Sequence, residues 1–161
     1  MMRRLIFFVG VCLASGIFQP SVWAEEHTME KKFINPSTIA TPRGYTHVVT
    51  VTGGKTVFIA GQVAFNQKGE LVGKGDLRAQ TTQVYENLKN ALAAAGATTA
   101  DVVKLNTYVV DFKAADLAAI REIRGQYFPF ENMPASTLVG VQALAFDGFL
   151  IEVEAIAMVK G

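Results

Sequence analysis

Two carboxylates near the C-terminus are the residues of this sequence best suited to proton transfer. Glu152 and Glu154 lie in residues 149–158, a segment rich in β-forming side chains. Strand alternation places both on one face, and the other residues on that face are Leu150, Ile156 and Met158. Apolar surroundings raise the pKa of a carboxyl group and allow proton transfer near neutral pH. The alternative interpretation is an edge of the sheet, or a structural salt bridge to Lys104 or to an arginine.

A pair of arginines forms the second candidate group. Arg121 and Arg124 are three residues apart in a segment with helical periodicity, so they share one face of the predicted helix. A solvated helix surface is the simpler interpretation of this pair. In the alternative, one guanidinium turns into a pocket and binds a substrate carboxylate through two parallel hydrogen bonds.

Other common catalytic groups are scarce. The two histidines, His27 and His47, have no carboxylate or cysteine at ligand spacing, so we predict no metal site. The serines at 37 and 136 lack the Gly-x-Ser-x-Gly pattern of a hydrolase elbow. The glycines near 54 and 73–75 lack the remaining residues of a phosphate or dinucleotide loop. The sequence therefore predicts a protein without cofactors.

The N-terminus has the pattern of a secretory signal. Arg3 and Arg4 precede an apolar run at residues 5–18, and Val22-Trp23-Ala24 is typical of a cleavage site. The apolar run is shorter than the ~20 residues that span a bilayer, although an uncleaved anchor is the alternative. We expect residues 1–24 to be a signal peptide cleaved after Ala24, and a periplasmic or secreted protein with no stable membrane insertion.

The remaining chain has the composition of one packed domain. Of 161 residues, 50% are hydrophobic and only 18% are charged, which argues against disorder. Cleavage after Ala24 removes two of the 15 basic residues and none of the 14 acidic ones, giving a charge of −1. Such a charge predicts no nucleic-acid partner. Residues 25–44 are expected to be an N-terminal arm, followed by a domain at 45–161.

The periodicity of the domain predicts an α+β fold. Strands are expected at 45–51 and 56–60, paired as a hairpin through Gly53-Gly54, and at 102–110, 137–144 and 149–159. Helices are expected from an N-cap at Asp76 to Gly96, and from 114 to 128 before Pro129. Both helices would cover one face of a mixed sheet. The uncovered face would then be apolar, which predicts an oligomer.

The order of short motifs resembles the RidA/YjgF family of imine-hydrolysing and related proteins. Between residues 40 and 159 the matching pieces are Gly44-Tyr45, 57–62, Gln80, Asn87-Leu88, Ala95-Gly96-Ala97, 101–104, Pro134-Ala135-Ser136 and 151–157. The resemblance implies a fold like that of the trimeric chorismate mutases. It also implies a homotrimer with small-molecule pockets between its subunits.

The resemblance also implies residue roles. In deaminating members the first Glu of the last-strand motif positions the attacking water, a role that would fall to Glu152. Tyr45 would line the substrate pocket. Ala60, where the family often has Ser, and Gly61 would lie beside the substrate, and Arg121 lies near the position of a common pocket Asn.

One position departs from the family pattern. An Arg directly after Pro-Ala holds the substrate carboxylate in deaminating members, and this sequence has Ser136 there. A hydroxyl cannot replace a bidentate guanidinium, whose charge-assisted hydrogen bonds contribute about 1.5–3 kcal/mol. Hydrolysis of 2-imino acids is therefore expected to be weakened unless another cation takes over; Arg121 is the first candidate and Arg43 the second.

Two functions remain open from the sequence. In the first, the protein hydrolyses imines or enamines with a water positioned by Glu152, like 2-iminobutanoate/2-iminopropanoate deaminases. In the second, an exported trimer binds a small ligand or a partner without turnover. The substitution at Ser136 and the signal peptide motivate the second function, and the retained Glu152 motivates the first.

Overall fold

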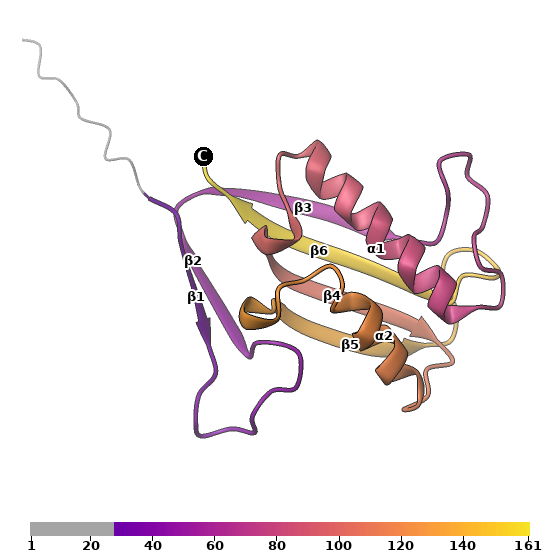
Figure 1. Cartoon of the computed structure of the whole chain (residues 1–161), viewed down its shortest axis with the longest axis horizontal. Helices are drawn as coiled ribbons and strands as arrows, with labels where there is room; N and C mark the ends of the chain where they lie inside the picture. The colour runs from indigo at the N-terminus through magenta and orange to yellow at the C-terminus, as the bar shows by residue number, and fades with distance from the viewer. Residues whose placement is uncertain (1–27) are drawn as a thin grey trace, which may run out of the picture.

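The computed structural model describes residues 28–161, so the signal peptide predicted at 1–24 lies outside the described residues. The described chain forms six strands and two α-helices (Figure 1). In chain order these are β1 (Glu30–Ile34), β2 (Val48–Thr52), β3 (Lys55–Gln62), α1 (Leu77–Ala94), β4 (Val102–Val110), α2 (Asp116–Arg124), β5 (Ala135–Val141) and β6 (Ile151–Val159).

The main sheet is mixed and four-stranded. Its strand order is β3-β6-β4-β5, in which β6 is antiparallel to both of its neighbours and β4 is parallel to β5. Both helices cover the same face of this sheet (Figure 1). The core between the layers includes Leu88 and Leu92 of α1 and Ile151 and Val153 of β6. The predicted α+β class, with two helices on one sheet face, is confirmed.

The predicted hairpin between the first two domain strands is wrong. Strand β2 pairs instead with β1, in the predicted arm, with Phe33 opposite Val49, and β3 pairs with the C-terminal strand β6. Gly53 and Gly54 both adopt positive φ, 72° and 80°, which directs the chain from one sheet into the other. The arm at 25–44 therefore contains a strand that local periodicity did not reveal.

The two helices agree with their predictions to different degrees. Helix α1 begins after the predicted N-cap, since the Asp76 carboxylate accepts a hydrogen bond from the Ala79 amide at 3.1 Å. Helix α2 is shorter than the predicted 114–128. After Arg124 the amides of Gln126 and Tyr127 donate to carbonyls three residues back, which tightens the chain into turns before Pro129 is reached.

Two polar motif residues on α1 have structural roles. Gln80 is fully buried, and its side-chain amide donates to the carbonyls of Gly73 and Gly148 at 3.1 and 2.8 Å. The Asn87 amide donates to the carbonyls of Val63 and Phe65 at 2.9 and 2.8 Å. These hydrogen bonds fix the loops that follow β3 and precede β6, at the ends of the two strands that carry Gly61 and Glu152.

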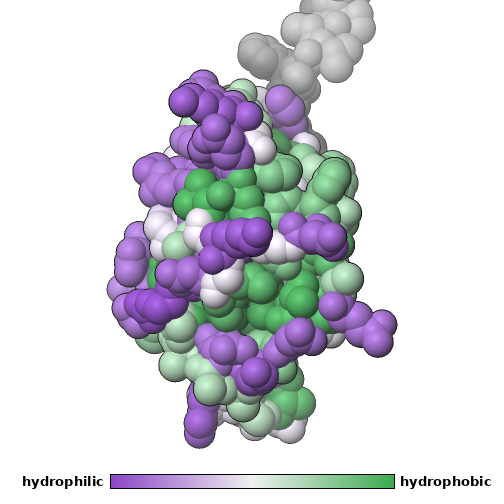
Figure 2. Space-filling view, turned by 90° about the vertical axis from the view of Figure 1, so that its right-hand side faces the viewer, coloured by the Kyte–Doolittle hydropathy of each residue, from purple (hydrophilic) through white to green (hydrophobic). Residues whose placement is uncertain are grey.

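These two loops also form one end of the molecule. Phe65, Phe146 and Phe149 pack there edge to face or tilted, with ring centroids 4.7–6.3 Å apart, and Phe146 remains 65% exposed. Figure 2 faces this end and shows apolar areas separated by polar side chains. No helix in the described part of the chain is long and apolar enough to cross a membrane.

The sheet face opposite the helices is uncovered. Along β6 every second residue packs toward the helices, so that Glu152, Glu154 and Ile156 lie on the other face. On the neighbouring β3, Phe58 lies opposite Ile156 and is 76% exposed. Phe58 and Ile156 together place contiguous apolar surface on this uncovered face, which is typical of a surface that another chain covers.

Candidate functional site

The carboxylate of Glu152 lies across the neighbouring strand, directly over Gly61. A Cβ atom added to Gly61 would be 1.8 Å from Glu152 Oε1, so no other residue type fits at this position without displacing the carboxylate. The register of β3 against β6 shifts between Ile59 and Gln62, which re-aims this part of β3. Ala60 is exposed beside the glycine. The structure therefore brings together three predicted site residues: Ala60, Gly61 and Glu152.

The two carboxylates of β6 have different surroundings. Glu154 accepts hydrogen bonds from Asn106 Nδ2 at 2.7 Å and from the Tyr108 hydroxyl at 3.0 Å. The second of these bonds raises the pKa of Tyr108. Among the described residues no hydrogen bond or ion pair involves the Glu152 carboxylate. Lys104 donates to Thr137 instead, so the alternative of a salt bridge to Lys104 is wrong for this chain.

Replacement of Gly61 tests whether the position of the Glu152 carboxylate matters. Gly61→Ala forces the carboxylate away from β3 because the new methyl group occupies its place. We expect imine hydrolysis to fall by at least about tenfold with little change in the far-UV circular dichroism spectrum. Gly161→Ala, where an added Cβ atom meets no other atom within 4 Å, is the matched control and should retain activity. Full activity in Gly61→Ala would show that this carboxylate position is not needed.

Three other predicted residues line a second site on the helix side of the sheet. Tyr45, Arg121 and Ser136 line a cavity of about 280 Å³ between α2, β5 and the segment before β2. Arg43 and Arg124 line the same cavity, as do the apolar side chains of Phe112, Leu117, Ile120 and Leu138. Arg43, the second candidate for a replacement cation, therefore lines the same cavity as Ser136.

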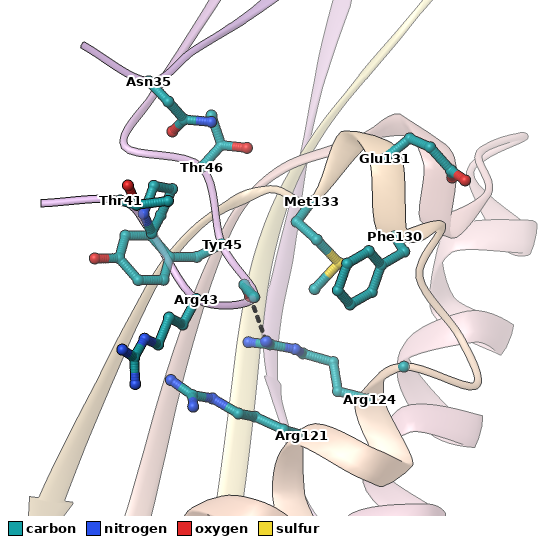
Figure 3. Close-up of a pocket in the computed structure, with 13 residues that line it drawn as sticks. Asn35, Thr41, Arg43, Tyr45, Thr46, Arg121, Arg124, Phe130, Glu131 and Met133 are labelled. Atoms are coloured by element: carbon teal, nitrogen blue, oxygen red, sulfur yellow. Dashed lines mark hydrogen bonds between the residues drawn. The ribbon is translucent and has the colours of Figure 1, made fainter. Parts of the chain in front are cut away.

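Arg124 is the guanidinium nearest to the altered family position. Its Nη1 lies 3.5 Å from the Ser136 hydroxyl, and its Nη2 donates to the Gly44 carbonyl (Figure 3). Arg124 is only 8% exposed, and this burial lowers its pKa. The solvated-surface interpretation is therefore wrong for Arg124, whereas Arg121 is exposed. The sequence contains a signal for the burial of Arg124, since this residue follows the apolar Ile120 by four residues and Ile123 by one.

Gly44 allows this arrangement. Its φ is +78°, in the left-handed region, and an added Cβ atom would lie 3.0 Å from Arg124 Nη2. The glycine thus lets the backbone turn over the guanidinium and present its carbonyl oxygen. Figure 3 shows Arg43, Arg121 and Arg124 gathered beside Tyr45, with the bond from Arg124 to the Gly44 backbone as a dashed line.

The two groups of site residues lie on opposite faces of the sheet. Ser136 lines a cavity with the buried residues Thr107 and Ile120 beneath α2, whereas Glu152 lies on the uncovered face. Strand β4 also separates β5, which carries Ser136, from β6, which carries Glu152. Within one protomer the carboxylate therefore does not meet the guanidinium.

Comparison with known proteins places the fold and these motifs in a family. The model of the family described as Endoribonuclease L-PSP matches residues 36–159 of this chain. The chain belongs to this family, also called RidA/YjgF. A crystal structure of a conserved Rid family protein from Yersinia pestis superposes with a TM-score of 0.74. That protein is 50% identical to this chain, covering 80% of this chain and 98% of its own.

Two RidA/YjgF relatives are named for deaminase activity. The 2-iminobutanoate/2-iminopropanoate deaminase of Dermatophagoides farinae is 32% identical, over 81% of this chain and 98% of its own length. The 3-aminoacrylate deaminase RutC of Acinetobacter baylyi is 31% identical, over 81% of this chain and 100% of its own length.

This RidA/YjgF chain has no group of three or more His, Cys, Asp or Glu able to hold a metal among residues 28–161.

Proposed function

We propose that this protein hydrolyses imines or enamines derived from amino acids, at a site shared by two subunits. The observation that supports this function best is the pair of half-sites. One is an unpartnered carboxylate on the uncovered face, and the other is a buried guanidinium beside the family's carboxylate-binding position. The deaminase names of two relatives favour turnover over a binding protein without catalysis.

A second copy of the chain would bring the half-sites together. The uncovered face offers the exposed Phe58 and the partly buried Ile156, and β5 is an edge strand that carries the guanidinium site just behind it. A head-to-tail contact that places the β5 edge of one copy on the uncovered face of the next closes into a ring when repeated with the right rotation. We propose a homotrimer, in which all three shared sites are equivalent.

Hydrolysis in this site uses groups of both copies. Arg124 binds the carboxylate of the imino acid, and Tyr45 lines the pocket. Glu152 of the neighbouring copy holds a water and accepts its proton while the oxygen adds to the imine carbon. The same carboxyl group returns the proton to the nitrogen, which gives a carbinolamine. It then transfers the hydroxyl proton of the carbinolamine to the nitrogen, the carbon–nitrogen bond breaks, and a 2-oxo acid and ammonia leave. An enamine first takes up a proton at carbon and loses one from nitrogen to become the imine.

In the proposed site, Arg124 takes the role of the carboxylate-binding arginine that the family has at the position of Ser136. The lost family arginine followed Pro134-Ala135 on β5, and the guanidinium of Arg124 reaches the same place from α2, 3.5 Å from the Ser136 hydroxyl. Carboxylate binding is weakened relative to an arginine at 136, because Arg124 also donates to the Gly44 carbonyl. The proposed setting is the periplasm or the outside of the cell, after removal of residues 1–24.

A mixture of two impaired variants tests the shared site. Glu152→Gln and Arg124→Met each impair one half-site, so each pure variant should keep about a tenth or less of native activity at substrate concentrations well below the native KM. Each ring of three that contains both variants has one shared site in three with both native residues, so about one third of native activity returns in the oligomers that carry both tags. The two variants are co-expressed with different affinity tags, and oligomers that carry both tags are isolated.

The control is the same tandem purification from cells that express one variant with both tags. These oligomers should keep only the low activity of the pure variant, which excludes contamination by native protein. Mixed doubly tagged oligomers with no more activity than the pure variants would contradict a site built from two copies. A chain that remains a monomer at micromolar concentration in sedimentation would contradict it as well.

A further inference from the structure

The cavity beside Ser136 holds more positive charge than one carboxylate requires. Arg43, Arg121 and Arg124 all line it, and no Asp or Glu does. The ion pairs among residues 28–161 involve other cations, namely Lys31, Lys32, Arg78 and Lys89. A buried guanidinium is normally paired with an anion, and here none of the described residues supplies one.

A second cavity continues from the first past the same arginines. It has a volume of about 620 Å³ and shares with the smaller one Arg43, Gly44, Tyr45, Arg121 and Arg124. Its further lining includes Phe130 and Met133, and Glu131 is its single carboxylate. Glu131 lies on the far side of Phe130 and Met133 from the arginines (Figure 3). The guanidiniums therefore stand where the two cavities meet.

The three arginines differ in the hydrogen bonds that their side chains form with the rest of the protein. Arg124 is held by the Gly44 carbonyl and lies beside Ser136, at the position expected for the first carboxylate. No hydrogen bond joins the side chain of Arg43 or Arg121 to another described residue, although both line both cavities. Their donors are free for a second anionic group on the part of the substrate that extends into the larger cavity.

From this geometry we infer that the substrates are imines with a second acidic group, the 2-imino dicarboxylates. This inference rests on the proposed function. The first carboxylate lies at Arg124, and the second, at the end of the side chain, lies between Arg43 and Arg121. Hydrolysis of such an imine releases ammonia and a 2-oxo dicarboxylate. The reaction that supplies it is the oxidation of an acidic amino acid to its imine.

Binding of unreactive analogues tests the inference without requiring turnover. In isothermal titration of the full-length mature protein, succinate and glutarate should bind about 10–100-fold more tightly than butanoate and pentanoate. The double variant Arg43→Gln/Arg121→Gln should lose this preference. Arg78→Gln, which removes an exposed arginine of α1 paired with Glu122, is the matched control and should keep it.

Inorganic phosphate serves as the competing dianion. Tighter binding of phosphate than of either dicarboxylate would assign the arginines to a phosphate group and overturn the inference. Equal affinity for mono- and dicarboxylates would overturn it too. Retention of the preference in the double variant would overturn the assignment to Arg43 and Arg121.

Measurements of imine hydrolysis distinguish a failure of this inference from a failure of the proposed function. Imines are generated from aspartate or glutamate and from alanine by amino-acid oxidases, and ammonia release above the buffer rate is compared. A higher kcat/KM for the dicarboxylic imine, reduced in the double variant more than for the alanine imine, supports both proposals. Selective binding without hydrolysis of any imine supports the dicarboxylate site and contradicts the proposed hydrolysis.

Discussion

Glu152→Gln is expected to lower kcat for imine hydrolysis by about 10²–10⁴-fold, the usual contribution of a positioned general base. The amide has the shape of the carboxylate but cannot accept a proton from water at neutral pH. Because the Glu152 carboxylate has no hydrogen-bond or ion-pair partner among the described residues, folding should be unaffected. The measurement is ammonia release from the imine of alanine, formed in place by an oxidase, with the buffer rate subtracted.

Glu154→Gln is the matched control for this variant. Glu154 lies two residues away on the same face, with the same partial burial, but is engaged by Asn106 and Tyr108. Its amide variant should retain native kcat within a few-fold. A Glu152→Gln protein with native kcat, or an equal loss in both variants, would contradict the assignment of the base to Glu152.

The helices and the central strands could be predicted because their signals are local. Helix α1 follows from an N-cap at Asp76 and a regular apolar stripe, and β4 has its predicted bounds, Val102–Val110. The wrong hairpin had a local signal as well, two strands joined by Gly53-Gly54. Pairing of β3 with β6 and of β1 with β2 depends on contacts between distant parts of the chain, which periodicity does not encode.

The site was predictable in its residue types and only partly in its arrangement. Alternation along β6 was enough to separate Glu152 from the residues that face the helices. The insertion of β4 between β5 and β6 decides that Ser136 and Glu152 cannot meet in one copy, and no motif reports that order. From the sequence, a solvated surface was the simpler prediction for Arg124, because a charged side chain is rarely buried without a partner. In the proposed site, the substrate carboxylate supplies the anion that pairs with this buried guanidinium.

Arg124→Met is expected to separate substrate binding from stability. Loss of charge-assisted hydrogen bonds to the substrate carboxylate should raise KM for an imino acid by about 10–100-fold. The free energy of unfolding should stay near the native value or increase. Removal of a buried cation avoids a desolvation cost of several kcal/mol, while the lost bond to the Gly44 carbonyl is worth about 1.5–3 kcal/mol.

Two measurements distinguish this expectation from a purely structural role of Arg124. The first is thermal unfolding, where a structural arginine would lower Tm on replacement and a ligand-binding arginine would not. The second is the rise in Tm with succinate, which should occur in the native protein and disappear in Arg124→Met. A variant that unfolds at lower temperature yet keeps both its KM and its stabilisation by succinate would show that Arg124 only supports the Gly44 turn. A stable variant with a raised KM and no response to succinate fits a guanidinium that the fold keeps buried for the substrate carboxylate.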